Sequence, residues 1–273
     1  MQFQLRLQCL EQSSGRNPVL PFNYPYRLSG WLYGLLREVD HEYAAFLHEQ
    51  GYRLAGTESN RGKTFKLFTF SDLRPHRYAI SPQRGGIELL SPEVDWTIGF
   101  YVEKAAETFI TGLFAKQTCR ITGRGQDLLF RVAQVAAVPV TLSTDTVQLR
   151  TLSPLVVAEK QPNGNDRYLS PEAPQYGTLL IGNLIDKFRS VHPEVVPADK
   201  SQFSYQLLPR KKPPRSRLLT IKEGSRQQTQ IRGYYDFAFA LSGPKEYLEV
   251  GLYAGLGRYN AEGCGCVELH PKE

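Results

Sequence analysis

Four glycines in two mirrored pairs constrain the local fold of this chain more than any other feature. The segment reads Gly255-Leu-Gly257, five mostly polar residues beginning with Arg258, and Gly263-Cys-Gly265. This spacing predicts a loop whose backbone enters conformations that residues with a Cβ avoid. Such a loop can turn successive N–H groups toward an anion, and Arg258 adds a full charge beside them. In this sequence only eight residues follow, too few for the helix that a dinucleotide fingerprint must open.

The glycine pattern closely resembles the C-terminal signature of the Cas-six family, the CRISPR-associated endoribonucleases that cut repeat RNA into guide units. In that family two Gly-hydrophobic-Gly units flank five residues with at least one Lys or Arg. All four glycines match. Within the loop the sequence departs: many members have Lys-Asn-Ser, and Phe between the last glycines, where this chain has Tyr259-Asn260-Ala261 and Cys264. The positive charge has moved one place, to Arg258.

Five shorter segments resemble further landmarks of the family, in the family's order. They are Leu20–Tyr24, Leu32-Tyr33, Phe46–His48, Lys66–Ser71 and Leu152–Leu155. The resemblance therefore covers nearly the whole chain, and it implies two tandem ferredoxin-like domains.

The hydrophobic pattern independently predicts an α+β chain in which one β-α-β-β-α-β order occurs twice. In the first half we expect strands at 2–10, 64–71, 78–90 (a hairpin), 95–102, 117–123 and 127–136, and helices at 24–38 (capped by Asn23), 41–50 and 103–114. In the second half we expect strands at 145–158, 203–209, 216–222, 228–241 and 266–270, and helices starting at Ser170 and after Pro244. The predicted domains are residues 1–140 and 141–273.

Composition restricts the partner and the compartment. A net charge of +6 favours a polyanion. Four cysteines without a C-x-x-C pair indicate a reducing cytosol rather than a disulfide framework, and they form no zinc tetrad. The alternating segment 2–9 indicates a strand rather than a signal peptide, and no apolar run is long enough to span a membrane. We expect no cofactor, no metal and no membrane contact.

RNA carries its own nucleophile, the 2′-hydroxyl. A protein can therefore cut it without metal by removing the proton of that hydroxyl, protonating the departing 5′-oxygen and placing positive charge beside the phosphorane as it forms. A His and a Lys or Arg, with a Tyr as a further candidate, would serve. His48 lies about 145° from the apolar stripe of its helix, and Tyr33 about 130° from the stripe of the preceding one. Both therefore point away from the packed faces.

The resemblance assigns these positions. Members with a histidine on this second helix commonly pair it with a tyrosine on the first helix and a lysine shortly after, which here are His48, Tyr33 and Lys66. His41 is the alternative histidine, because seven residues return to nearly the same helical face. Lys63 and Arg61 are alternatives for the charge.

A basic segment between residues 210 and 232 predicts contacts with a phosphate backbone. Its cations are Arg210, Lys211, Lys212, Arg215, Arg217, Lys222, Arg226 and Arg232, against the single acid Glu223. With Gly255, Gly257, Arg258, Gly263 and Gly265, they form the predicted RNA-binding set. The alternative is a solvated charged hairpin.

Three functions remain open from the sequence. The first is a metal-independent endoribonuclease acting on CRISPR repeat RNA in the cytoplasm. The second is a non-cleaving RNA-binding scaffold that partners other subunits of a CRISPR effector complex. The third is an unrelated pair of ferredoxin-like binding or metabolic domains.

Overall fold

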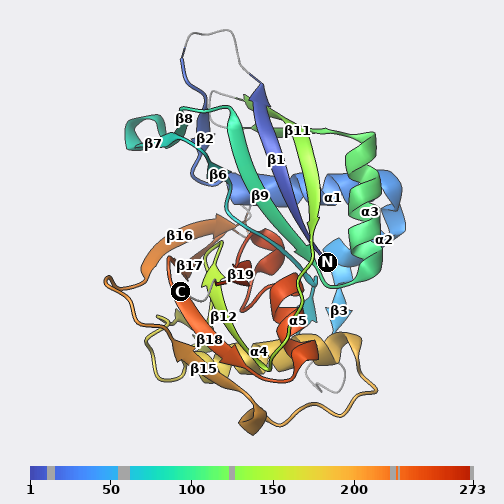
Figure 1. Cartoon of the computed structure of the whole chain (residues 1–273), viewed down its shortest axis with the longest axis vertical. Coiled ribbons are helices and arrows are strands. Elements are labelled where there is room, and N and C mark those ends of the chain that lie inside the picture. The colour runs from blue at the N-terminus through green and yellow to red at the C-terminus, as the bar shows by residue number, and fades with distance from the viewer. Residues whose placement is uncertain (11–15, 55–61, 123–126, 222–225, 227, 271–273) are drawn as a thin grey trace.

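The computed structural model describes residues 1–10, 16–54, 62–122, 127–221, 226 and 228–270. Two antiparallel sheets, one from each half of the chain, carry helices and lie one above the other in Figure 1. Arg61 and Lys222, both candidates from the sequence, lie outside the described residues.

The first sheet has the strand order β10-β11-β1-β9-β5, with β6 also paired to β9. Apolar side chains at alternate positions of β1, such as Phe3, Leu5 and Leu7, are buried in one core with the apolar faces of the helices. The elements of this unit are β1 (Gln2–Leu10), α1 (Tyr24–Val39), α2 (His41–Ala45), β5 (Phe68–Phe70), β6 (Arg74–Pro75), β9 (Glu93–Phe100), α3 (Glu103–Ala115), β10 (Thr118–Thr122) and β11 (Asp127–Val138).

Several short strands and helical turns belong to the first half of the chain but lie outside the first sheet. A three-stranded sheet of order β2-β8-β7 projects from it, and β3 pairs with β4 near the second half of the chain. Their bounds are β2 (Val19–Pro21), β3 (Tyr52–Arg53), β4 (Thr64–Phe65), β7 (Tyr78–Ser81) and β8 (Gly86–Leu89), with helical turns η1 (Phe46–Gln50) and η2 (Pro82–Arg84).

The second sheet has the order β15-β18-β12-β19 and a separate core that includes apolar faces of α4 and α5. Two hairpins, β13–β14 and β16–β17, lie outside it. The bounds are β12 (Thr146–Thr151), β13 (Ala158–Lys160), β14 (Asp166–Tyr168), α4 (Tyr176–Val191), η3 (Lys200–Gln202), β15 (Ser204–Leu207), β16 (Arg215–Ile221), β17 (Thr229–Tyr235), β18 (Ala238–Ser242), α5 (Lys245–Ala254), η4 (Asn260–Glu262) and β19 (Val267–Leu269).

Both sheets have ferredoxin-like topology. In the order β11-β1-β9-β5 the fourth, first, third and second strands of a β-α-β-β-α-β unit lie side by side, and β19-β12-β18-β15 repeats that order. The predicted fold class is therefore confirmed. The first sheet ends with β11 at Val138 and the second begins with β12 at Thr146. That each half is a separate domain, divided at residues 140 and 141, stays a prediction.

Several predicted strands are shorter than expected because single residues leave the extended conformation. The predicted strand 64–71 breaks between β4 and β5, where Leu67 has φ 55° and packs into the second core while Phe68 packs into the first. Likewise, Asp236 at φ 65° separates β17 from β18. A single residue with left-handed backbone turns the following side chains to a new direction.

Helix starts also differ from expectation. Helix α4 begins at Tyr176 rather than at Ser170, whose carbonyl instead accepts the Ala173 N–H in a turn. Asn23 occupies the N-cap position of α1 but makes no side-chain capping hydrogen bond, and a proline follows in the first turn. The predicted cap of the next helix is present, since the Asp40 carboxylate accepts the Tyr43 N–H at 2.8 Å.

Candidate functional site

Tyr33, His48 and Lys66, hereafter the Tyr33 cluster, lie together in the structure. The rings of Tyr33 and His48 meet edge to face with centroids 5.1 Å apart. The Lys66 Nζ donates to the His48 backbone carbonyl at 2.9 Å. His48 is exposed, whereas Tyr33 and Lys66 are half-buried. A histidine ring that is in contact with solvent and beside a phenol can exchange protons next to an anionic ligand, and the Lys66 ammonium lies at the backbone of the same histidine.

A local distortion of the helix positions His48. Residues Phe46–Gln50 form a π-helical turn in which the Gly51 N–H donates to the Phe46 carbonyl at 2.7 Å. Gly51 has φ 66°, and a Cβ there would come within 2.6 Å of the Phe65 carbonyl and 3.1 Å of the Lys66 side chain. Glycine at this position therefore lets Lys66 pass close beneath His48.

Glu262, from η4 in the second half of the chain, acts on two members of the Tyr33 cluster. Burial raises the pKa of Tyr33 above its usual range, and the Glu262 charge adds to this effect. Burial lowers the pKa of Lys66, and Glu262 opposes that shift. The phenol is therefore held neutral, and the two halves of the chain jointly set the electrostatics of the cluster.

The other histidines have different settings. His41 is exposed at the first position of α2, His76 contacts Glu93 and Asp95, and the Tyr101 hydroxyl lies 2.9 Å from the His192 ring. Of the alternative cations, Lys63 forms an ion pair with Asp186 at 2.5 Å. Among the five histidines, His48 is the one whose ring meets Tyr33.

The glycine-rich loop adopts the left-handed conformations that its sequence predicts. Gly255, Gly257, Gly263 and Gly265 have φ between 67° and 83°. A Cβ on Gly265 would lie 1.9 Å from the Leu256 carbonyl, and one on Gly257 would lie 2.4 Å from the Val156 carbonyl. Backbone atoms cannot yield at these distances, so both positions require glycine.

The N–H groups of this loop are used differently from the expected anion nest. Several donate to carbonyls of the protein itself: those of Leu256, Arg258, Glu262, Gly263, Cys264 and Gly265. Arg258 also pairs with Asp166 at 3.1 Å. Much of the polarity that the sequence offers to an anion therefore stabilises the loop.

The side chain of Lys187 binds this loop through hydrogen bonds, and the sequence did not indicate this role. Its side chain is buried on α4, with 2% of the residue exposed. Its Nζ donates to the carbonyls of Gly255 at 2.5 Å and Gly257 at 3.0 Å, and to the Asn260 Oδ1 at 2.6 Å. Burial lowers the pKa of Lys187 to about 7. A lysine three residues after Leu184 on an apolar stripe was the available signal.

The loop joins the two halves of the chain. The Thr69 hydroxyl, on β5, donates to the Cys264 carbonyl at 3.0 Å. Gly263 fits tightly against the first half, since a Cβ there would lie 2.6 Å from the Phe70 ring. These contacts bring η4, and with it Glu262, against α1 and β5.

The basic segment, residues 210–232, is divided between paired and exposed cations. Arg217 forms an ion pair with Asp72 at 2.5 Å, and Asp72 also accepts from Tyr24 at 3.2 Å. Burial acts to lower the Arg217 pKa, but the charge and hydrogen bond of Asp72 together with the nearby Tyr24 and Cys264 outweigh it and raise that pKa. Arg210 pairs with Glu172 at 2.7 Å. The Arg217 pair thus ties β16 to the first half of the chain.

The remaining cations of this segment are more accessible. Arg215 lies over the Tyr235 ring at 5.3 Å, and Arg232 donates to the Ser216 hydroxyl at 2.9 Å. Lys211, Lys212, Arg215 and Arg226 are exposed. These side chains keep a solvent-facing charge on or beside the β16–β17 hairpin.

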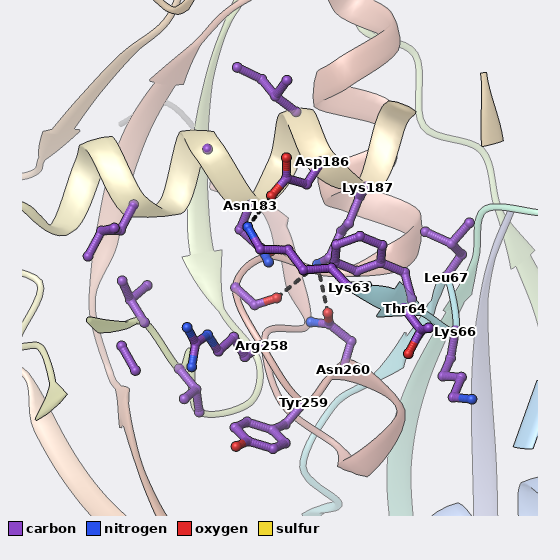
Figure 2. Close-up of a pocket in the computed structure, with 18 of the residues that line it drawn as sticks. Lys63, Thr64, Lys66, Leu67, Asn183, Asp186, Lys187, Arg258, Tyr259 and Asn260 are labelled. Carbon is purple, nitrogen blue, oxygen red and sulfur yellow. Dashed lines mark hydrogen bonds and ion pairs between the residues drawn. The ribbon is translucent and has the colours of Figure 1, made fainter. Parts of the chain in front are cut away.

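A pocket of about 800 Å³ lies between residues 63–67, helix α4 and the glycine-rich loop. In Figure 2, Lys63 extends toward Asp186 on α4, and Lys187 reaches Asn260 in the loop. Lys66 and Glu262 also line this pocket, so it adjoins the Tyr33 cluster.

The described part of the chain lacks two further kinds of feature. No group of three or more His, Cys, Asp or Glu side chains in this part of the chain could hold a metal ion. No helix in the same residues is long and apolar enough to cross a membrane.

Comparisons with known proteins agree with this architecture. Residues 137–269 match the family model "CRISPR associated protein Cas6, C-terminal". A curated relative, the CRISPR-associated endoribonuclease Cas6 of Pyrococcus furiosus, is 24% identical over 98% of this chain and 90% of its own length. The solved structure of a Cas6-related gene product from Pyrococcus furiosus superposes with a TM-score of 0.80 at 21% identity, covering 100% of this chain and 99% of that one.

A second solved structure, described as an RAMP protein binding different RNA substrates, has a TM-score of 0.77 at 22% identity and covers 99% and 100% of the two chains. The fold thus defines a tandem ferredoxin-like protein. Residues 137–269 of the chain are thus similar to the C-terminal part of the Cas6 family, and nearly the whole chain is similar to one Cas6 endoribonuclease.

Proposed function

We propose that this protein is a metal-independent endoribonuclease that binds CRISPR repeat RNA and cleaves the precursor transcript. The observation that carries the proposal is the meeting of Tyr33, His48 and Lys66 beside a loop from the second half of the chain. The similarity to a relative that is named a CRISPR-associated endoribonuclease supports the same activity.

The chemistry uses a nucleophile that belongs to the RNA. The 2′-oxygen attacks the adjacent phosphorus while the bond from phosphorus to the 5′-oxygen breaks. One proton leaves the 2′-hydroxyl and one reaches the departing 5′-oxygen, which leaves a 2′,3′-cyclic phosphate and a 5′-hydroxyl. His48 is exposed and can exchange one of these protons.

In this mechanism Tyr33 aligns the phosphate and Lys66 stabilises its negative charge. The neutral phenol of Tyr33 donates a hydrogen bond toward the phosphate, and the Lys66 ammonium offsets the negative charge that grows on its oxygens. Lys66 also fixes the His48 backbone through its carbonyl. The exposed cations of the basic segment hold the RNA backbone through phosphate contacts, and the glycine-rich loop supports the cluster from the second half of the chain.

The test uses a CRISPR repeat RNA as the substrate. Cleavage in excess EDTA with a 2′,3′-cyclic phosphate product is expected, and a single 2′-deoxy sugar at the cut should stop the reaction while binding persists. Loss of cleavage in EDTA that is restored by a divalent cation would contradict the proposed chemistry.

A second candidate is a non-cleaving scaffold that carries repeat RNA into an effector complex with other subunits. The setting of Lys66 leaves room for it, because one of the three N–H donors of this ammonium is already engaged by the His48 carbonyl. Tight binding of the repeat without any cut would select this function.

A further inference from the structure

The pocket beside the Tyr33 cluster has the charge of an anion site. Six cations line it against two acids: Lys63, Lys66, Lys187, Arg189, Lys200 and Arg258, against Asp186 and Glu262. Lys187 is occupied with the loop, and Lys63 and Arg258 are paired with carboxylates. Arg189 and Lys200 leave a net positive rim, which favours a ligand that carries a phosphate.

The interior of the pocket offers a polar group that matches a base. The side-chain oxygen of Asn183 is buried and has no hydrogen-bond partner in the described part of the chain. A buried polar atom without a partner is costly, so a ligand that supplies one gains affinity. A carboxamide presents a donor and an acceptor along one edge, and base edges complement that pattern.

Aromatic walls and size point to the same ligand. Phe65 and Tyr259 line the pocket, and both residues are half-buried. Bases stack on such rings without regard to sequence. A volume of about 800 Å³ is ample for one nucleotide.

The location of the pocket beside the Tyr33 cluster determines which nucleotide of the RNA can enter it. Lys66 and Glu262 line the pocket and also belong to, or act on, the Tyr33 cluster. We propose that this pocket binds one unstacked nucleotide of the RNA next to the scissile phosphate, with its base against Asn183 and Phe65. The inference rests on the proposed cleavage function and adds a base-binding site to it.

An abasic scan tests this site in the full-length protein. Repeat RNAs blocked by a 2′-deoxy sugar at the cut each carry one abasic nucleotide, and affinity is measured by fluorescence anisotropy at fixed salt. At one position next to the cut, the abasic RNA should bind the wild-type protein about tenfold more weakly, the scale of one base stack.

Substitutions connect that loss to the pocket. Asn183→Leu and Phe65→Leu should weaken binding of the intact RNA, and the abasic RNA should then bind no worse than the intact one. Gln117→Ala removes an exposed amide between α3 and β10 and should keep the full tenfold difference. A thermal melt of each variant establishes that it is folded, and the two pocket variants provide independent tests.

Different results would contradict the proposed base-binding pocket and the proposed cleavage function. An abasic penalty that stays tenfold in both folded pocket variants overturns the pocket, as does a scan without any penalty beside the cut. A free nucleoside monophosphate that binds tightly while the scan stays flat also overturns it. Cleavage of the unmodified RNA, scored separately, reports on the proposed function alone.

Discussion

The Tyr33 cluster and the β16–β17 hairpin differ in what the fold does with their polar groups. In the cluster, His48 remains exposed while Tyr33 and Lys66 pack around it. On the hairpin, Arg217 is paired with Asp72, whereas its neighbour Arg215 faces solvent over Tyr235. Two arginines only two residues apart thus have different environments. A count of basic residues therefore overstates the charge that a polyanion can contact.

The largest effect is expected from substitutions in the Tyr33 cluster. His48→Ala should slow cleavage of repeat RNA by about a hundredfold or more, the scale of a lost general acid or base. Tyr33→Phe and Lys66→Ala should slow it less. Single-turnover rates with saturating protein measure the chemical step.

His41→Ala is the matched control, because His41 is exposed on α2 and not in ring contact with Tyr33. It should cut at the wild-type rate. If His41→Ala fails while His48→Ala cuts normally, the mechanism holds and the histidine assignment is wrong.

On the hairpin, Arg217→Ala should reduce stability by about 2 kcal/mol, because it leaves the Asp72 carboxylate partly buried without its partner. The pair is not fully enclosed, so we expect less than the loss for a buried pair. Arg215→Ala should change the melting temperature little. Thermal melts of both variants measure the difference, and equal melting temperatures would contradict the structural role of Arg217.

A third prediction concerns Lys187, whose folded pKa is about 7 against an ordinary value of 10.5. Between these values the unfolded chain binds more protons, so stability should rise with pH; below about 7 both states are protonated and the cost of burying the ammonium is fully present.

The matched comparison is Lys187→Met. The difference in unfolding free energy, wild type minus variant, should grow between pH 7 and pH 9 by up to about 1.4 kcal/mol per unit. Urea unfolding at several pH values measures it. A difference that stays constant over this range would show that Lys187 keeps an ordinary pKa.

The smallest effect is expected from Arg215 and Arg217 in RNA binding. Arg215→Ala should reduce the magnitude of the salt slope of RNA binding by about one unit, as expected for one lost phosphate contact. Arg217→Ala, if folded, should leave the slope unchanged because its charge is already neutralised. Equal losses of slope would mean that RNA displaces Asp72 and that the hairpin acts as one continuous basic surface.

Local patterns predicted most of the fold, and the family resemblance selected Tyr33, His48 and Lys66. Alternation in β1, the stripe of α1 and the glycines near the end of the sequence are short-range signals. Helical geometry placed His48 outside the packed face, where the structure has it exposed, but Tyr33 is half-buried and packs against Phe68 in the first core. The sequence could not predict Glu262 beside Tyr33, nor Lys187 beneath Gly257. Those contacts depend on how the two halves pack, which no periodicity within one segment encodes.

The pairing of Arg217 with Asp72 was missed for the same reason. The two residues are 145 positions apart, and nothing in the basic segment distinguishes Arg217 from Arg215. The breaks at Leu67 and Asp236 were also missed. Left-handed backbone at a leucine follows from tertiary packing rather than from residue preference, and although aspartate adopts it more often than most residues, a single Asp is a weak signal for it.

The position of Glu262 has a consequence for biosynthesis. Tyr33, His48 and Lys66 leave the ribosome long before α4 and the glycine-rich loop, so a nascent chain holds the cluster without Glu262 beside it and without Lys187 supporting the loop. If the first half folds as the separate domain that the sequence predicts, the cluster and its surroundings form in two stages. The proposed cleavage activity should therefore reach its full level only after η4 has docked on β5, once synthesis has passed that segment.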